Sequence, residues 1–158
     1  MLQRYLEYNL WANTRLVDNI KAVPAEEISA LPLAPFGSIY DALRHIVGAE
    51  NIWLERVRGQ SPSDFMGITE GKTLNELLDM LAARSNEWVQ YFETNPSSLT
   101  GTFTYATTKG DQFTQSTQDV VMHVVNHSTY HRGQIMSALR SVYEGRLAAL
   151  DMLVFTRS

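Results

Sequence analysis

The apolar residues of this chain recur every three or four positions in four long segments, which is the spacing of one buried helical face. Proline or glycine follows each segment at a point where a helix can end. Two of the segments open with a serine or threonine three residues before an acidic residue, the pattern of a capping box. We therefore predict four helices, from about Leu2 to Ala22, Ser38 to Arg58, Thr73 to just before Pro96, and Ser116 or Thr117 to about Glu144.

The connections between these helices carry turn residues and one strand-like stretch. Residues 59–72 hold glycine and proline at intervals, which indicates a loop. Residues 97–115 are rich in Thr, Ser and Gly, and two strand-like runs there flank Lys109-Gly110-Asp111. We therefore predict a small β-hairpin in the loop before the last long helix. Short helical turns are expected within 24–31 and 147–155.

This pattern predicts an all-α protein in which the long helices form an antiparallel bundle. The chain has 158 residues, a length that fits one domain spanning 1–158. Hydrophobic residues make up 44% and charged residues 19%, which is the composition of an ordinary globular protein and not of a disordered one.

Composition also excludes several classes of function. The chain has no cysteine, which rules out disulfides, thiolate metal ligands and a cysteine nucleophile. Its formal net charge of −4 gives no concentrated basic face for nucleic acid. No apolar run approaches the ~20 residues of a membrane span, and the N-terminus lacks the apolar core of a signal peptide. We therefore expect a cytoplasmic protein that binds neither nucleic acid nor a membrane.

Three of the four histidines lie on neighbouring turns of the last long helix, because His123, His127 and His131 are four residues apart. On a helical wheel, His131 falls inside the apolar stripe centred on Val124 and His127 falls at its edge, while His123 lies on the flank. Two imidazoles in a buried stripe need polar partners, and one shared metal ion would satisfy both.

A third ligand has to come from another helix, and His45 is the remaining histidine. It lies at the flank of the apolar stripe of the second long helix, where the small side chains of Ala42 and Ala49 leave room for an ion. His45, His127 and His131 are therefore the candidate ligands of one divalent cation. The same pattern also fits histidines that pack in the core or at its boundary without a metal, and spacing alone does not decide between the two.

Familiar metalloenzyme signatures are missing around these histidines. A zincin carries His-Glu-x-x-His with the glutamate as general base, whereas Ser128 stands at that position here. The paired Glu-x-x-His motifs of a di-iron bundle and a phosphate-binding glycine loop are absent as well. We therefore expect neither metalloprotease nor di-iron chemistry.

Several segments resemble the motifs of the DinB family, also called DinB/YfiT-like proteins. The segment HVVNHSTYHRGQ (123–134) resembles the family signature, and HIVGAENIW (45–53) is similar to its second-helix motif. The segment YNLWAN (8–13) looks like its opening motif, and DMLV (151–154) resembles its C-terminal end. The resemblance spans nearly the whole chain and implies a four-helix bundle with long crossover connections.

The resemblance also implies a site and a chemistry. By position it places the metal ligands at His45, His127 and His131, with zinc or nickel as the ion and water completing its shell. Many relatives are homodimers, which implies a homodimer here. Some related proteins are thiol-dependent transferases, which implies a low-molecular-weight thiol as a cosubstrate.

Three histidines with open coordination positions match a catalytic site better than a closed structural one. We therefore expect a metal-dependent enzyme, such as a thiol-dependent S-transferase or a hydrolase, that acts on a small-molecule substrate. Its catalytic residues beyond the ligands cannot be named from the sequence. The alternatives are a metal-binding stress protein without catalysis and a dimeric bundle whose metal is structural.

Four further residues flank the ligands and are candidates to orient a ligand or to line a pocket, namely His123, Tyr130, Arg132 and Gln134. Arg132 could bind an anionic substrate group, although a surface salt bridge is the stronger expectation. Glu50 lies roughly 140° round the helix from His45, so it is a poor candidate for direct proton transfer. Trp11 and Trp53 are expected in the core.

Overall fold

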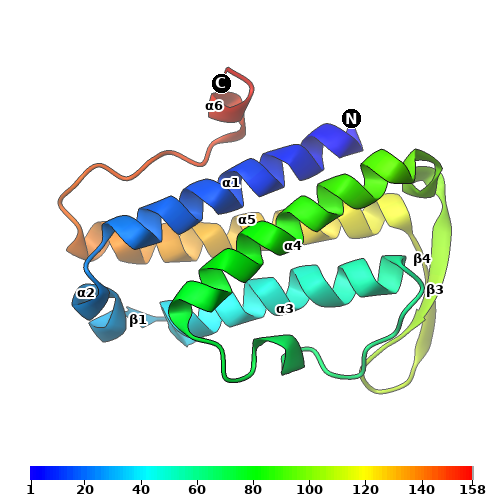
Figure 1. The fold of residues 1–158 in the computed structure, drawn as a ribbon, viewed down its shortest axis with the longest axis horizontal. Helices are drawn as coiled ribbons and strands as arrows, with labels where there is room; N and C mark the ends of the chain where they lie inside the picture. The colour runs from blue at the N-terminus through cyan, green and yellow to red at the C-terminus, as the bar shows by residue number, and fades with distance from the viewer. Residues whose placement is uncertain (158) are drawn as a thin grey trace.

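Four long helices pack side by side in the computed structural model, which describes residues 1–157 (Figure 1). Their bounds fall within a few residues of the predicted ones, because apolar spacing and end signals agree along the chain. The long helices are α1 (Leu2–Ala22), α3 (Ile39–Val57), α4 (Leu74–Thr94) and α5 (Thr117–Val142). The short elements are the helices α2 (Ala25–Ala30) and α6 (Met152–Phe155) and the 3₁₀ turns Gly67–Thr69 and Pro96–Thr100.

Side-chain caps fix where three of the four long helices begin. Thr73 accepts a hydrogen bond from the backbone N–H of Glu76, and the Glu76 carboxylate accepts one from the backbone N–H of Thr73 at 2.8 Å, which completes the predicted capping box. Ser38 caps α3 by accepting from the N–H of Asp41 at 3.1 Å. Ser116 caps α5 in the same way.

The helix directions differ from a purely antiparallel bundle. α1 and α3 each pack against both α4 and α5, so they occupy opposite corners. α1 runs antiparallel to α4, and α3 runs antiparallel to α5, but α3 and α4 point the same way (Figure 1). The chain between α3 and α4 therefore has to run back along the bundle, where its 3₁₀ turn Gly67–Thr69 contacts α3. This is the crossover topology that the family resemblance implied.

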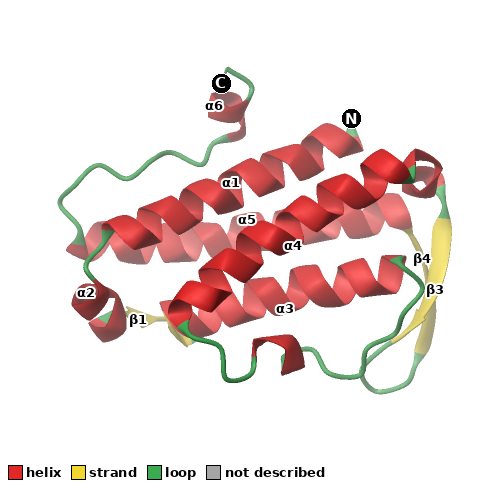
Figure 2. Cartoon of the chain, viewed as in Figure 1, coloured by secondary structure: helices red, strands yellow, loops and turns green. Residues whose placement is uncertain are grey.

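Two small antiparallel sheets lie outside the helices and are drawn yellow in Figure 2. The predicted hairpin consists of β3 (Thr102–Ala106) and β4 (Gln112–Ser116), with Tyr105 opposite Phe113. Gly110 in its turn has φ 92°, a conformation that glycine adopts without strain. The second pair, β1 (Pro32–Leu33) and β2 (Gly37–Ser38), was not predicted.

The C-terminal segment is less helical than predicted. Residues 143–151 are extended and return along the outside of the bundle, so only Met152–Phe155 forms a helical turn (Figure 1). Polar side chains of α1 hold this segment: the hydroxyl of Tyr8 donates to the carbonyl of Leu150 at 3.0 Å, and Asn19 exchanges hydrogen bonds with the backbone of Ala148 at 2.8 and 2.9 Å.

The apolar core is divided into two clusters by a layer of buried polar side chains. One cluster contains Leu16, Ile20, Leu43 and Leu81, and the other contains Leu6, Leu54, Trp88 and Val124. The polar layer between them consists of Asn9, Asn13, Glu50, Ser85, Ser128 and Arg132, all buried. Among the described residues, no helix combines the length and the apolar character needed to cross a bilayer.

Candidate metal centre

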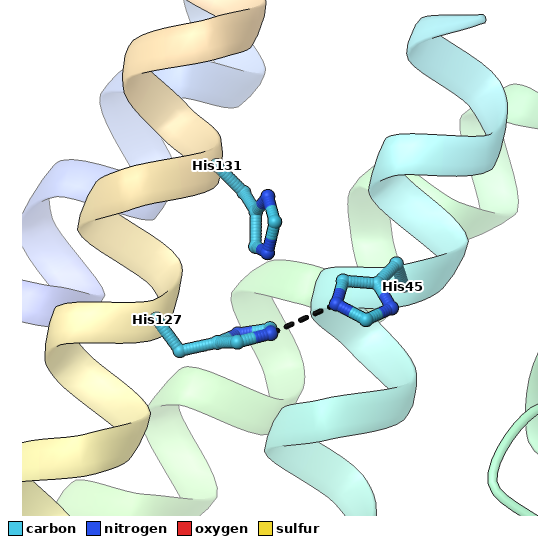
Figure 3. Close-up of side chains that lie close together, drawn as sticks. All are labelled: His45, His127 and His131. Atoms are coloured by element: carbon cyan, nitrogen blue, oxygen red, sulfur yellow. Dashed lines mark hydrogen bonds between the residues drawn. The ribbon is translucent and has the colours of Figure 1, made fainter. Parts of the chain in front are cut away.

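Three histidines converge between α3 and α5. His45 comes from α3, while His127 and His131 come from successive turns of α5 (Figure 3). The Nε2 atoms of His45 and His127 lie 2.8 Å apart, and the His131 ring centroid lies 4.5 Å from that of His127 and 4.8 Å from that of His45. One ligand atom from each of the three rings lies within 4.8 Å of the others. The sequence predicted this trio from the helical spacing of His127 and His131 and from His45 as the remaining histidine.

Gln134 fixes the orientation of one ring. The Nδ1 atom of His131 lies 2.7 Å from the side-chain carbonyl oxygen of Gln134. That oxygen can only accept, so Nδ1 carries the proton and Nε2 keeps its lone pair. Outer hydrogen bonds of this kind orient metal-ligating histidines in proteins. By contrast, the Nδ1 atom of His127 is buried and has no hydrogen-bond partner among the described residues.

The electrostatics of the cluster favour neutral imidazoles. Burial, and after it the neighbouring His131, His45 and His123 in that order of effect, together lower the pKa of His127 from 6.5 to about 3. Burial also lowers the pKa of His45, with His131 as the second cause. A histidine has to be neutral to donate a lone pair to a metal, so these rings are held in their ligand form at neutral pH.

Aromatic side chains from two connections surround the histidines. Phe36, in the β1–β2 turn, lies 5.1 Å from the His45 ring and 5.0 Å from the His131 ring. Phe65, in the α3–α4 crossover, lies 5.4 Å from His45. The crossover packs closely here because Gly48 has no side chain: a Cβ at that position would lie 2.8 Å from the Phe65 carbonyl oxygen. Both phenylalanines lie in loops without periodic pattern, and sequence reasoning missed them.

The flanking residues His123 and Tyr130 are both exposed. The His123 ring lies 5.8 Å from the His127 ring and 5.5 Å from the Trp53 ring, so it stands one turn beyond the histidine trio. Tyr130 is 65% exposed and its ring lies 4.9 Å from that of His131. Trp11 and Trp53, both expected in the core, pack against it but remain partly exposed.

Arg132 is buried, so the expectation of a surface salt bridge is wrong. The side chain is 2% exposed and points toward α1. Its guanidinium donates to the Oδ1 atoms of Asn9 at 2.6 Å and Asn13 at 2.7 Å, and to the hydroxyl of Thr129 at 2.7 Å. A wheel gives only the direction of the Cα–Cβ bond, and a long arginine side chain reaches well beyond it.

The counter-charge of Arg132 is Glu50, which is fully buried. Its carboxylate accepts hydrogen bonds from the amides of Asn9 and Asn13 at 2.8 and 2.7 Å, and from the hydroxyls of Ser85 and Ser128 at 2.7 and 3.0 Å. Two asparagines therefore bridge one carboxylate and one guanidinium. These bonds hold Glu50 in the core. The sequence signal for this buried network was the presence of asparagines inside the apolar stripe of the first helix.

The donor set is compatible with a divalent transition-metal ion. Imidazole nitrogen binds zinc at ~2.0–2.1 Å, so two ligands of one ion lie at most about 4 Å apart. The present spacing within 4.8 Å requires only a small adjustment of the side chains. His45 and His127 are partly exposed, which leaves access to the cluster from outside.

The chain is thus a crossover four-helix bundle in which three histidines between the antiparallel helices α3 and α5 could hold a metal ion. The sequence model of the DinB family matches residues 1–143, so the chain belongs to the DinB family. Protein DinB from Bacillus subtilis (strain 168) is 28% identical over 141 residues, covering 85% of this chain and 81% of that protein. The crystal structure of a candidate DinB-family member from Exiguobacterium sibiricum 255-15 matches with a TM-score of 0.65 at 20% identity, over 95% of this chain and 97% of that one.

Replacing Arg132 by methionine should strongly destabilise the fold. The change leaves Glu50 as a buried charge without a counter-charge, which costs about 3–5 kcal/mol. Urea unfolding of the metal-free protein measures the loss. The matched control is Arg140→Met, an exposed arginine two turns further along α5, with an expected change within about 0.5 kcal/mol. A loss below about 1 kcal/mol for Arg132→Met would contradict the buried pair.

The metal-free protein should lose stability in mild acid through His127. The unfolded chain takes up a proton near pH 6.5, whereas the folded chain does so only near its lowered pKa of about 3. The His127 contribution is therefore complete above pH 6.5 and is lost as the pH falls toward 3. The unfolding free energy of wild type, measured by urea across this range, should fall more steeply with decreasing pH than that of His127→Gln. Parallel curves would show that His127 has an ordinary pKa.

Proposed function

We propose that this chain is a metal-dependent enzyme whose centre is one zinc or nickel ion held by His45, His127 and His131. The observation that carries the proposal is the convergence of three imidazole rings from two helices at a partly exposed point. Three histidine ligands with a fourth position left open are typical of catalytic zinc sites, whereas structural sites use four protein ligands.

Coordination to a divalent ion lowers the pKa of a thiol or of water, so a nucleophile forms near neutral pH. The chain's own part is to keep the imidazoles neutral and to orient them. Burial favours the neutral form of His127 and His45, and the hydrogen bond to Gln134 orients the ring of His131. Imidazoles bind a metal in their uncharged form, so such ligands would leave the positive charge of the ion to act on the nucleophile.

The surroundings favour thiol transfer over hydrolysis. Ser128 occupies the position of the zincin glutamate, and its hydroxyl points into the core, where it donates to Glu50 at 3.0 Å. A free thiol starts from a pKa of about 8.5 and water from about 15.7, so a bound thiolate would form more readily than a bound hydroxide. In the proposed reaction a C–S bond forms, the leaving group departs with its electron pair, and the thiol proton goes to solvent.

The cosubstrates of this reaction are a low-molecular-weight thiol and a small electrophile. A borrowed thiol suits a chain that has no cysteine. The homodimer implied by the family stays a prediction, as does a cytoplasmic location.

Loss of one ligand should abolish metal binding. Even the loss of an outer hydrogen bond to a metal ligand lowers affinity about 10–100-fold, so His127→Ala should lower zinc affinity by more than about 100-fold. Elemental mass spectrometry of protein purified without a metal-binding tag, followed by competition with a chromogenic chelator, measures content and affinity. His123→Ala is the matched control, because it removes a histidine one turn away on the same helix. Equal zinc affinity of wild type and His127→Ala would refute the site.

A thiol should bind at the loaded centre and react there. In cobalt-substituted protein, β-mercaptoethanol should produce a sulfur-to-cobalt charge-transfer band. With zinc or nickel, the protein should speed the alkylation of this thiol by iodoacetamide about 10-fold, since a free thiol is only a few per cent ionised at pH 7. Iodide release reports the rate. A cobalt spectrum that does not change when the thiol is added would contradict thiol transfer but not the metal site.

A further inference from the structure

A hollow of about 440 Å³ lies one helical turn from the histidine trio. Its walls come from three elements: Trp53 on α3, Val120 and His123 on α5, and Tyr105 and Phe113 on the hairpin. Gln115 and Asp119 complete the lining. The volume lies within the range of small-molecule sites, which are mostly apolar and aromatic with a few polar groups.

The hollow and the histidine trio lie along one seam between α3 and α5. Trp53 is eight residues after His45, and His123 is four residues before His127, so each lies on the same stripe of its helix. The rings form a continuous series: Trp53 lies 5.5 Å from His123, and His123 lies 5.8 Å from His127. One helical step of four residues advances ~6 Å, which is the distance between the trio and the near wall of the hollow.

The walls of the hollow are held in place. The Trp53 and Tyr105 rings meet edge to face at 5.2 Å. The Arg56 guanidinium packs over both rings, at 4.7 Å from Trp53 and 4.6 Å from Tyr105. Arg56 is 7% exposed. Its Nε atom has no hydrogen-bond partner among the described residues, and its guanidinium packs against these two rings instead. In contrast, Phe113 closes the hollow from the hairpin and is 52% exposed.

We propose that this hollow binds a neutral aromatic group of the substrate while the reactive group of the same molecule reaches the histidine trio. Flat rings stack well on a wall of Trp53, Tyr105 and Phe113. Asp119 is the acidic residue of the lining, so it disfavours an anionic substituent on the ligand. This inference rests on the proposed function for the reacting end of the substrate, but binding of the aromatic end can be tested without any metal.

The first experiment uses the metal-free chain and phenethyl alcohol, which has the aromatic group and no thiol. Titration followed by amide NMR shifts should perturb residues around Trp53, Phe113 and His123. Phe113→Ser should weaken the binding about 10-fold, the lower end of what burying such a side chain contributes. Leu153→Ser, which removes an apolar side chain 66% exposed outside the hollow, should leave it unchanged. Scattered shifts, or equal binding by Phe113→Ser, would overturn the proposal.

The second experiment links the hollow to the metal. In cobalt-substituted protein, phenethyl mercaptan should bind about 10-fold more tightly than β-mercaptoethanol, because its two-carbon spacer lets the ring reach the hollow. Phe113→Ser should remove this advantage and leave cobalt affinity unchanged. Equal affinity for the two thiols would overturn the hollow as a substrate site. If phenethyl alcohol binds in the hollow but neither thiol perturbs the cobalt spectrum, the aromatic site stands and thiol transfer fails.

Discussion

The bridged pair of Glu50 and Arg132 is the interaction on which the arrangement of the bundle depends. Its hydrogen bonds connect all four long helices, since Asn9 and Asn13 lie on α1, Glu50 on α3, Ser85 on α4, and Ser128 and Arg132 on α5. A buried charge is tolerated only with its partners in place, so a shift of α5 by one turn would leave the carboxylate and the guanidinium uncompensated. The pair therefore selects one register. Ser128 and Arg132 directly follow His127 and His131 in sequence, so that register also turns these two rings toward His45.

Local signals made much of the fold predictable. Apolar spacing placed the long helices, Thr73 with Glu76 set the start of α4, and the turn at Gly110 indicated the hairpin. Helix direction was not encoded in the same way, because an amphipathic stripe reads alike whether its neighbour is parallel or antiparallel. The parallel pairing of α3 and α4 follows instead from a crossover long enough to run back along the bundle.

The candidate site, like the fold, was predictable from the sequence only in part. The three histidines were predictable because two share a helical stripe and only one other histidine remained. Arg132 was misjudged, because its position on a wheel does not show where a long side chain finds its partners. Its partners on another helix, Asn9 and Asn13, lie on α1. The contacts of Phe36 and Phe65 with the trio could not be predicted, because the positions of these side chains depend on the path of irregular loops.

Three phenylalanines that lie beside the trio or line the hollow come from the connections between the long helices. Phe36 lies in the β1–β2 turn, Phe65 in the α3–α4 crossover and Phe113 on the hairpin, whereas the donors and the buried polar layer lie on the long helices. Loops change in sequence and length more readily than the packed elements that they connect. Descendants of one ancestral bundle can thus diversify the molecules they accept by altering connections alone, with the inherited donor set and helix register kept intact.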